Sequence, residues 1–297
     1  MKHFFFILGF FISCVDGNKT LPSSTGKNSE IIFVVDDLLW QNSVDNLVKG
    51  IFEEPIHGVG QNERMFELVQ INHHEFKSIF QTHRNIVIIS KTAKTSSEIN
   101  KWASPQFVAQ LNWEGNIEKL KNELVQLRRA FFLKEVRLLR DQLSRESNKK
   151  AENTRASNFG ADLIIPKEYQ ILNNDSILFW AHYNPAKSDE IKNILTFSFL
   201  PTQTNFQIEL LHKTDSFFSK YLKGEKEGSY VRIEPEYIPY YSENTYRGLW
   251  KLENGFMGGP FLIKSYFVQD KIIVNIGLVF APQSRKRRYI KEFEAIL

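Results

Sequence analysis

The first half of the chain alternates compact apolar runs with segments of helical spacing. The runs EIIFVVDD and RNIVIIS are rich in β-branched residues and predict buried strands, and RMFELVQIN and FVAQLNW predict two more. Apolar residues recur at helical spacing in LLWQNSVDNLVKGIFEE and HHEFKSIFQTH, so each of these segments predicts an amphipathic helix. Strands that alternate with helices indicate an open α/β sheet.

Residues 116 to about 150 carry the longest helical pattern in the chain. Apolar side chains follow one another three or four positions apart from Ile117 to Phe131, and the series continues to Leu143 after a slip of one residue. Such a helix would be about 50 Å long. Its first half has the spacing of a coiled-coil seam, so two arrangements are open. We favour a helix that lies across its own sheet over an intermolecular coiled coil. The run NKKAENTRASN that follows predicts a hinge.

The second half of the chain has a different pattern. DLIIPKEYQIL and DSILFWAHYN predict paired strands with an NND turn, IKNILTFSFL predicts a third strand, and residues 246–282 predict three more. FQIELLHKTDSFFSKYL and the closing RKRRYIKEFEAIL predict helices. The fold class is therefore mixed α+β and α/β. We expect residues 30–157 to form an N-terminal α/β domain that ends in the long helix, and residues 158–297 to form an antiparallel-rich α+β domain.

The opening MKHFFFILGFFISC has the pattern of a secretory signal. Two basic residues precede an apolar run of nine residues, and a small residue precedes Cys14, the only cysteine of the chain. Nine residues are too few to cross a bilayer, which needs about 20, but they suit the core of a signal peptide. The sequence Phe11-Ile12-Ser13-Cys14 resembles a bacterial lipobox, in which the cysteine becomes the lipid-bearing N-terminus.

This pattern explains why the single cysteine stands at position 14. A lipid acceptor needs a thiol there, whereas an oxidising envelope disfavours unpaired thiols elsewhere. One acyl chain holds a protein only marginally at a membrane, and two or three chains hold it stably. We predict a signal peptide over residues 1–13, lipidation at Cys14 and a flexible tether over residues 14–29. In the sorting rule of enteric bacteria, an aspartate directly after the lipidated cysteine retains a lipoprotein at the inner membrane. Val15 stands at that position, so the rule favours the outer membrane. The alternative is an ordinary cleaved signal with an incidental cysteine.

Composition and charge add little to this picture. The chain of 297 residues is 42% hydrophobic and 24% charged, as expected of a folded globular protein. Its net charge is only +4, and Arg285-Lys286-Arg287-Arg288 is its one basic run. We therefore predict no nucleic-acid partner. The basic run predicts a solvated turn before the last helix, and contact with anionic lipid head groups is the alternative.

No catalytic constellation is visible in the sequence. The chain has neither a Gly-x-Ser-x-Gly elbow nor a Ser-x-x-Lys motif with its companions, and lipidation would leave no cysteine nucleophile. His73, His74 and His83 lack the i, i+4 spacing of a helical zinc site, and we expect them at the surface. His182 predicts a packed strand residue. We predict no catalytic residue, no metal and no cofactor.

The strongest local motif is LWKLENGFMGGPF, residues 249–261. A glycine-rich loop cradles phosphate where it opens a helix, but here a strand-like segment follows. Asn254-Gly255 therefore predicts a hairpin turn, and Gly258-Gly259-Pro260 predicts a bulge or a close backbone approach in an edge strand. Trp250, Phe256 and Met257 are the candidate contacts for a ligand or partner.

The layout resembles a family of uncharacterised bacterial envelope lipoproteins, the domain of unknown function numbered 4837. The resemblance rests on the lipobox at Cys14, the segments VVDDLLW and HRNIVIIS, the long charged helix and YRGLWKLENGFMGGPF. It implies an envelope location in a Gram-negative bacterium, and it implies no reaction, cofactor or catalytic residue.

Three functions remain open at this point. We favour a membrane-tethered, non-catalytic binding or assembly protein, with an envelope protein partner on the long helix over residues 116–150. An envelope hydrolase of glycan or peptide would place two carboxyl groups roughly 5–9 Å apart in a cleft. A small-ligand carrier would need a sizeable apolar pocket.

Overall fold

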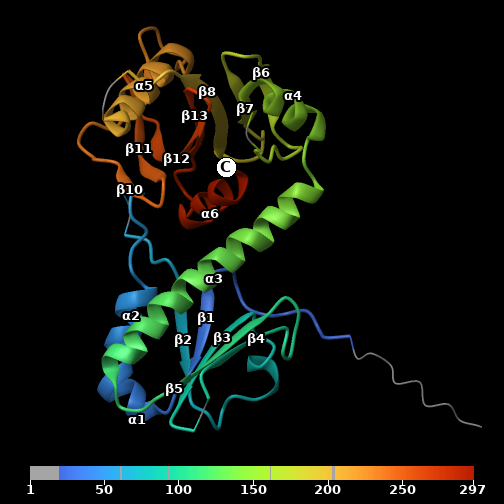
Figure 1. The fold of residues 1–297 in the computed structure, drawn as a ribbon, viewed down its shortest axis with the longest axis vertical. Helices are drawn as coiled ribbons and strands as arrows, with labels where there is room; N and C mark the ends of the chain where they lie inside the picture. The colour runs from blue at the N-terminus through green and yellow to red at the C-terminus, as the bar shows by residue number, and fades with distance from the viewer. Residues whose placement is uncertain (1–19, 61, 93, 161, 203–204) are drawn as a thin grey trace, which may run out of the picture.

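The computed structural model describes residues 20–297 except residues 61, 93, 161 and 203–204. The predicted signal peptide and Cys14 lie outside the described residues. The described chain forms two sheets joined by one long helix (Figure 1). The mixed α+β fold class is thereby confirmed. No helix in this part of the chain is long and apolar enough to cross a membrane.

The smaller sheet is the predicted open α/β sheet, with five strands in the order β2-β1-β3-β5-β4. All neighbours pair in parallel except β4, which is an antiparallel edge. Its elements are β1 (Glu30–Val34), α1 (Asp37–Leu39), a π-helical turn (Trp40–Val44), α2 (Asp45–Phe52), β2 (Glu67–Ile71), β3 (Asn85–Ser90), β4 (Ser96–Ile99) and β5 (Phe107–Asn112). Parallel sheets must be covered on both faces. One face packs against α2 and the long helix, and the loops that carry Phe76 and Trp102 cover the other.

The segment from His73 to His83 does not form the predicted helix. Within it, Ser78–Phe80 form a single 3₁₀ turn that follows an extended Lys77. Ser78 has a φ of 44°, which a right-handed α-helix does not tolerate. The prediction of a surface position for His83 is also wrong. That side chain is 4% exposed, and its Nδ1 and Nε2 are 3.0 and 2.9 Å from the Asn85 carbonyl oxygen and the Glu30 carboxylate.

The predicted flexible tether is partly docked. Within its described portion, Ser23 bridges to Ser104 and Thr25 bridges to His83 in parallel register. Backbone hydrogen bonds of 2.9 to 3.1 Å hold these residues to the loops beside β3 and β5. The chain therefore lies against the smaller sheet before β1 begins, because these loops offer free backbone donors and acceptors.

The long helix α3 (Ile117–Arg145) begins where Asn116 accepts a 3.0 Å hydrogen bond from the Lys119 amide, and it ends before the predicted residue 150. Leu120, Leu124 and Phe131 are buried against the smaller sheet. The helix thus lies across its own sheet, as we favoured. The seam that suggested a partner on residues 116–150 is filled by the core of the same chain, and that partner stays a prediction.

The predicted hinge after α3 is instead a second helix, α4 (Lys149–Phe159). Asn148 caps it by accepting a 3.1 Å hydrogen bond from the Ala151 amide, and Gly160 ends it with a left-handed φ of 72°. Ala151, Arg155 and Phe159 are buried against the larger sheet. The apolar periodicity did not indicate this helix, because its central buried side chain is Arg155. The Nη2 atom of Arg155 donates a hydrogen bond to Asn275 at 2.5 Å.

The larger sheet has the order β10-β11-β12-β13-β8-β7-β6, with β9 also paired to β11, and all pairs are antiparallel. The helix α5 (Phe206–Tyr221) covers one face, and α4 and α6 (Arg287–Ile296) cover the other (Figure 1). The strands are β6 (Gln170–Asn174), β7 (Phe179–Tyr183), β8 (Ile191–Phe199), β9 (Tyr230–Ile233), β10 (Tyr240–Ser242), β11 (Thr245–Glu253), β12 (Gly258–Val268) and β13 (Lys271–Phe280). The segment DLIIP, which we predicted as strand, precedes β6 outside the ladder.

A buried ion pair lies where α6 meets α3 between the two sheets. The ammonium group of Lys291 donates to the Glu135 carboxylate, and to the Ser29 hydroxyl at 2.6 Å. The same carboxylate accepts from the Ser29 amide at 2.8 Å and from the Asn85 side chain at 3.2 Å. Burial alone raises the pKa of Glu135, but Lys291 and Ser29 outweigh it and hold the pKa below its ordinary value.

Only part of the basic run is a solvated turn, since the side chains of Arg285 and Arg288 are exposed and the other two are not. Arg285 and Arg287 pair with Glu67 at the start of β2, and Lys286 is buried and donates to two carbonyl oxygens. The carboxylate of Glu63 accepts from the backbone amides of Lys286 and Arg287 at 2.5 and 2.8 Å. An acidic side chain from the loop before β2 thus caps the N-terminus of α6, where the helix dipole favours negative charge.

We expect Glu135→Gln to lower the free energy of unfolding by about 3 kcal/mol, because the buried Lys291 ammonium loses its counter-charge. The matched control is Glu118→Gln on the same helix, since Glu118 pairs with Lys121 at 3.9 Å in an exposed position. That change should cost no more than about 1 kcal/mol. Urea unfolding of both variants measures the difference, and equal losses would contradict the assigned role of Glu135.

Candidate ligand groove

The α5 face of the larger sheet carries a groove of about 980 Å³, here called the main groove. It opens where α5 ends and leaves part of the sheet uncovered. The lining comes from the strands β7, β8, β9, β11 and β13, from the loop between α5 and β9, and from the tip of the β11–β12 hairpin. Its lining residues are Trp180, His182, Ile191, Asn193, Leu222, Lys223, Gly224, Glu225, Lys226, Glu227, Ser229, Val231, Trp250, Leu252, Asn254, Gly255, Phe256, Met257 and Leu278.

The hairpin tip brings the three predicted contact residues together at this groove. The predicted turn at Asn254-Gly255 is confirmed, with Asn254 at a φ of 57° and a 2.8 Å hydrogen bond from the Leu252 amide to the Met257 carbonyl oxygen. Phe256 is 92% exposed at the tip, and Met257 is half-buried. Trp250 is buried, and its indole donates to the Val279 carbonyl oxygen at 3.2 Å. Whether the three bind a ligand stays a prediction.

The two glycines after the tip permit a close backbone approach, as predicted, but in an inner strand. The strand β12 lies between β11 and β13, and its register with β11 is regular from Gly258 to Lys264. A Cβ atom on Gly259 would lie 2.1 Å from the Val279 carbonyl oxygen. The prediction of a bulge in an edge strand is therefore wrong, because β12 pairs with β11 on one side and with β13 on the other.

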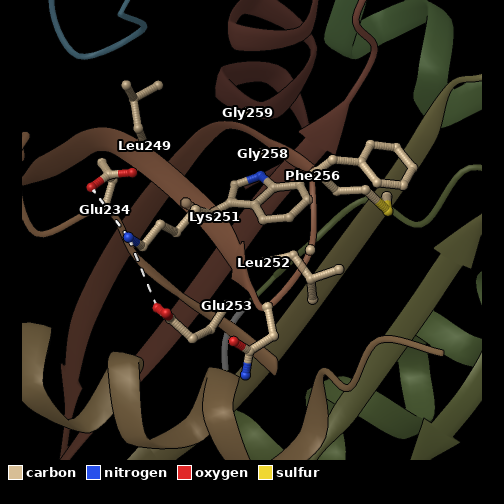
Figure 2. A pocket seen from close by; sticks show the side chains of 12 residues that line it. Glu234, Leu249, Lys251, Leu252, Glu253, Phe256, Gly258 and Gly259 are labelled. Atoms are coloured by element: carbon tan, nitrogen blue, oxygen red, sulfur yellow. Dashed lines mark ion pairs between the residues drawn. The ribbon is translucent and has the colours of Figure 1, made fainter. Parts of the chain in front are cut away.

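A second hollow of about 440 Å³ lies along the same hairpin, here called the side pocket (Figure 2). Figure 2 shows Lys251 between Glu234 and Glu253, and its ammonium nitrogen is 3.9 Å from each carboxylate. Two carboxyl groups that cleave a glycoside face each other across the scissile bond, whereas here a lysine side chain lies between them. These carboxylates therefore resemble a surface ion-pair network more than a hydrolytic pair.

A polar group stands on the floor of the main groove. Asn193 on β8 is opposite His182 on β7, and its Oδ1 is 2.8 Å from both the Trp180 indole nitrogen and the His182 Nδ1. Asn193 is 8% exposed, and its oxygen contacts two other lining residues of the groove. We predicted His182 as a packed strand residue, and it is one that also lines the groove.

The pattern of the sequence did not indicate Asn193, Trp180 or the segment from Leu222 to Val231 as groove residues. The period-two spacing of Trp180 and His182 places them on one face of β7, which was a usable signal. Nothing in the local sequence indicated that Asn193 lies opposite these two residues, because that position depends on the register between β7 and β8.

The two adjacent aspartates at the start of α1, Asp36 and Asp37, lie away from the groove. The carboxylate of Asp37 accepts a hydrogen bond from the Gln70 side chain at 3.1 Å. His73 and His74 also lie elsewhere, on the loop after β2. The described residues hold no group of three or more His, Cys, Asp or Glu side chains that could bind a metal.

Together these features define a two-sheet α+β protein with a largely apolar groove on its larger sheet. The chain belongs to the family described as Domain of unknown function (DUF4837), whose model matches residues 147–297. This confirms the resemblance to that family over the second half of the chain, and the envelope location that the resemblance implies stays a prediction. A second model, Domain of unknown function (DUF8532), matches residues 24–143. No curated protein matches the chain. The domain boundary that we placed near residue 158 stays a prediction.

We expect Gly259→Ala to lower the free energy of unfolding by about 2 kcal/mol, because the added methyl group would meet the Val279 carbonyl oxygen. Gly50→Ala is the control. Gly50 lies within α2 and nothing lies within 4 Å of its missing Cβ atom, so the change should stabilise by up to about 1 kcal/mol. Urea unfolding tests both variants, and a neutral Gly259→Ala would refute the close approach.

Proposed function

We propose that this chain is a lipid-anchored protein of the cell envelope that binds a small, largely apolar ligand in the main groove without transforming it. The observation that carries the proposal is the groove itself. Its volume of about 980 Å³ is at the upper end of the range typical of ligand sites, about 300–1,000 Å³. Apolar side chains from separate elements form much of the wall, and the four charged lining residues, Lys223, Glu225, Lys226 and Glu227, lie together on the loop after α5.

The geometry supports a groove that is formed before the ligand arrives. The indole of Trp250 is held by Val279, and the indole of Trp180 is held by Asn193. The loop after α5 is held to the hairpin region, since the Asn254 side chain donates to the Gly228 carbonyl oxygen at 3.2 Å. A preformed site loses little free energy in ordering on binding.

Binding is better supported than hydrolysis. The carboxylates of the main groove belong to Glu225 and Glu227, which lie on its exposed rim. The side pocket holds two carboxylates, and each is close to Lys251. Neither arrangement offers a buried carboxyl group opposite a second one, which acid–base cleavage of a glycoside requires.

The envelope location rests on the N-terminal sequence pattern. We predict that Cys14→Ser abolishes incorporation of labelled palmitate into the chain in growing cells, because only a thiol at this position accepts the diacylglycerol group. Ser13→Ala is the control, since it keeps a small residue before the cysteine and should leave labelling unchanged. Gel autoradiography of the immunoprecipitated chain gives the result. Equal labelling of the Cys14→Ser variant would overturn the lipid anchor.

The main groove predicts saturable binding of the neutral fluorophore N-phenyl-1-naphthylamine to the full chain in nanodiscs, with empty nanodiscs subtracted. Met257→Glu should weaken that binding at least about tenfold, because it places a charge in an apolar lining. Ile238→Glu is the matched control, since Ile238 is 88% exposed on the same part of the chain and lies outside the groove. Equal binding to both variants would contradict the proposal.

A further inference from the structure

The orientation of the Asn193 amide is determined by its neighbours. An indole N–H is only a donor, so the Asn193 atom 2.8 Å from the Trp180 nitrogen must be the carbonyl oxygen Oδ1. The His182 Nδ1 lies 2.8 Å from the same oxygen and must therefore carry a hydrogen. In neutral imidazole the other nitrogen is then an acceptor. The two contacts together thus assign the Asn193 amide and the His182 tautomer.

Two hydrogen-bonding atoms remain open toward the main groove. Among the described residues, neither the His182 Nε2 nor the Asn193 Nδ2 has a hydrogen-bond partner. The first is an acceptor and the second is a donor. Both residues line the groove, and they are cross-strand neighbours on β7 and β8. Neither atom is fully buried, so water reaches both, and a ligand that covers them binds more tightly if it replaces those hydrogen bonds than if it leaves the atoms unpaired.

The surroundings select the chemistry of the group that pairs with these atoms. The lining holds Lys223 and Lys226 against Glu225 and Glu227, so its charges balance and favour neither an anion nor a cation. Trp180, Leu222 and Leu278 line the same groove and give it apolar surface. The complementary group is uncharged and both donates and accepts one hydrogen bond.

We infer that the main groove selects an apolar ligand carrying an uncharged carboxamide, whose N–H donates to the His182 Nε2 and whose carbonyl oxygen accepts from the Asn193 Nδ2. This inference rests on the proposed function, since it names the ligand class of the same groove. His182 and Asn193 are the specificity-determining residues. An isosteric ligand without the amide N–H loses the contact with His182 and keeps the contact with Asn193.

The test uses hexanamide and 2-heptanone, which share their shape and carbonyl oxygen and differ only in that hexanamide has an NH2 group where 2-heptanone has a methyl group. Both compete with N-phenyl-1-naphthylamine for the full chain in nanodiscs. His182→Phe keeps a ring and removes the acceptor. We expect it to lower the ratio of hexanamide affinity to 2-heptanone affinity by about 5- to 10-fold, as one net hydrogen bond predicts. His182→Gln, which offers an amide oxygen, should restore part of that ratio.

The outcomes separate the two proposals. If the fluorophore does not bind the unaltered chain, the proposed function fails, and this inference fails with it. If the fluorophore binds but the affinity ratio is the same in the unaltered chain and in both His182 variants, the groove stands and the carboxamide selectivity is overturned. If one His182 variant no longer binds the fluorophore, the affinity ratio of the other variant decides, because both substitutions change the same acceptor nitrogen.

Discussion

The ammonium group of Lys291 joins three distant parts of the chain at one buried point. It reaches Glu135 on α3 and Ser29 before β1, and it lies over the rings of Phe66 and Phe132 at 4.7 and 5.6 Å. A buried cation is tolerated only where its partners are held in place. The position of α6 between the sheets follows from this requirement, and α6 in turn covers one face of the larger sheet. Only the opposite face is then left to carry a groove.

The strand β11 connects that interface to the groove, because its side chains alternate between the two faces. Arg247 and Leu249 meet the loop after α2, where Gly58 and Gly60 leave room for them at positive φ. Trp250 and Leu252 point to the other face and line the main groove. The strand β11 thus contacts the loop after α2 with one face and lines the main groove with the other. We therefore expect that loss of the contact between the two sheets disturbs the groove.

Features with a local signal were predictable from the sequence, and features that need distant partners were not. The β-branched runs of the smaller sheet, the seam of α3 and the turn at Asn254-Gly255 follow from periodicity and turn chemistry. The helix α4 was missed because Arg155 occupies its buried face. Glu63 and Glu67 anchor the basic run from more than 200 positions away in the chain. Asn193 became visible as a groove residue only with the register of β7 and β8.

The most direct measurement asks whether the main groove is occupied in living cells. A photo-reactive benzoyl-phenylalanine at position 256 would replace an exposed groove residue, and one at position 38 would replace Leu38, which is 76% exposed on the smaller-sheet part. After irradiation, intact mass spectrometry of the purified chain gives the mass of each adduct. Our account predicts a discrete small-molecule adduct at position 256 and none at position 38. No adduct at either position, or the same adduct at both, would contradict it.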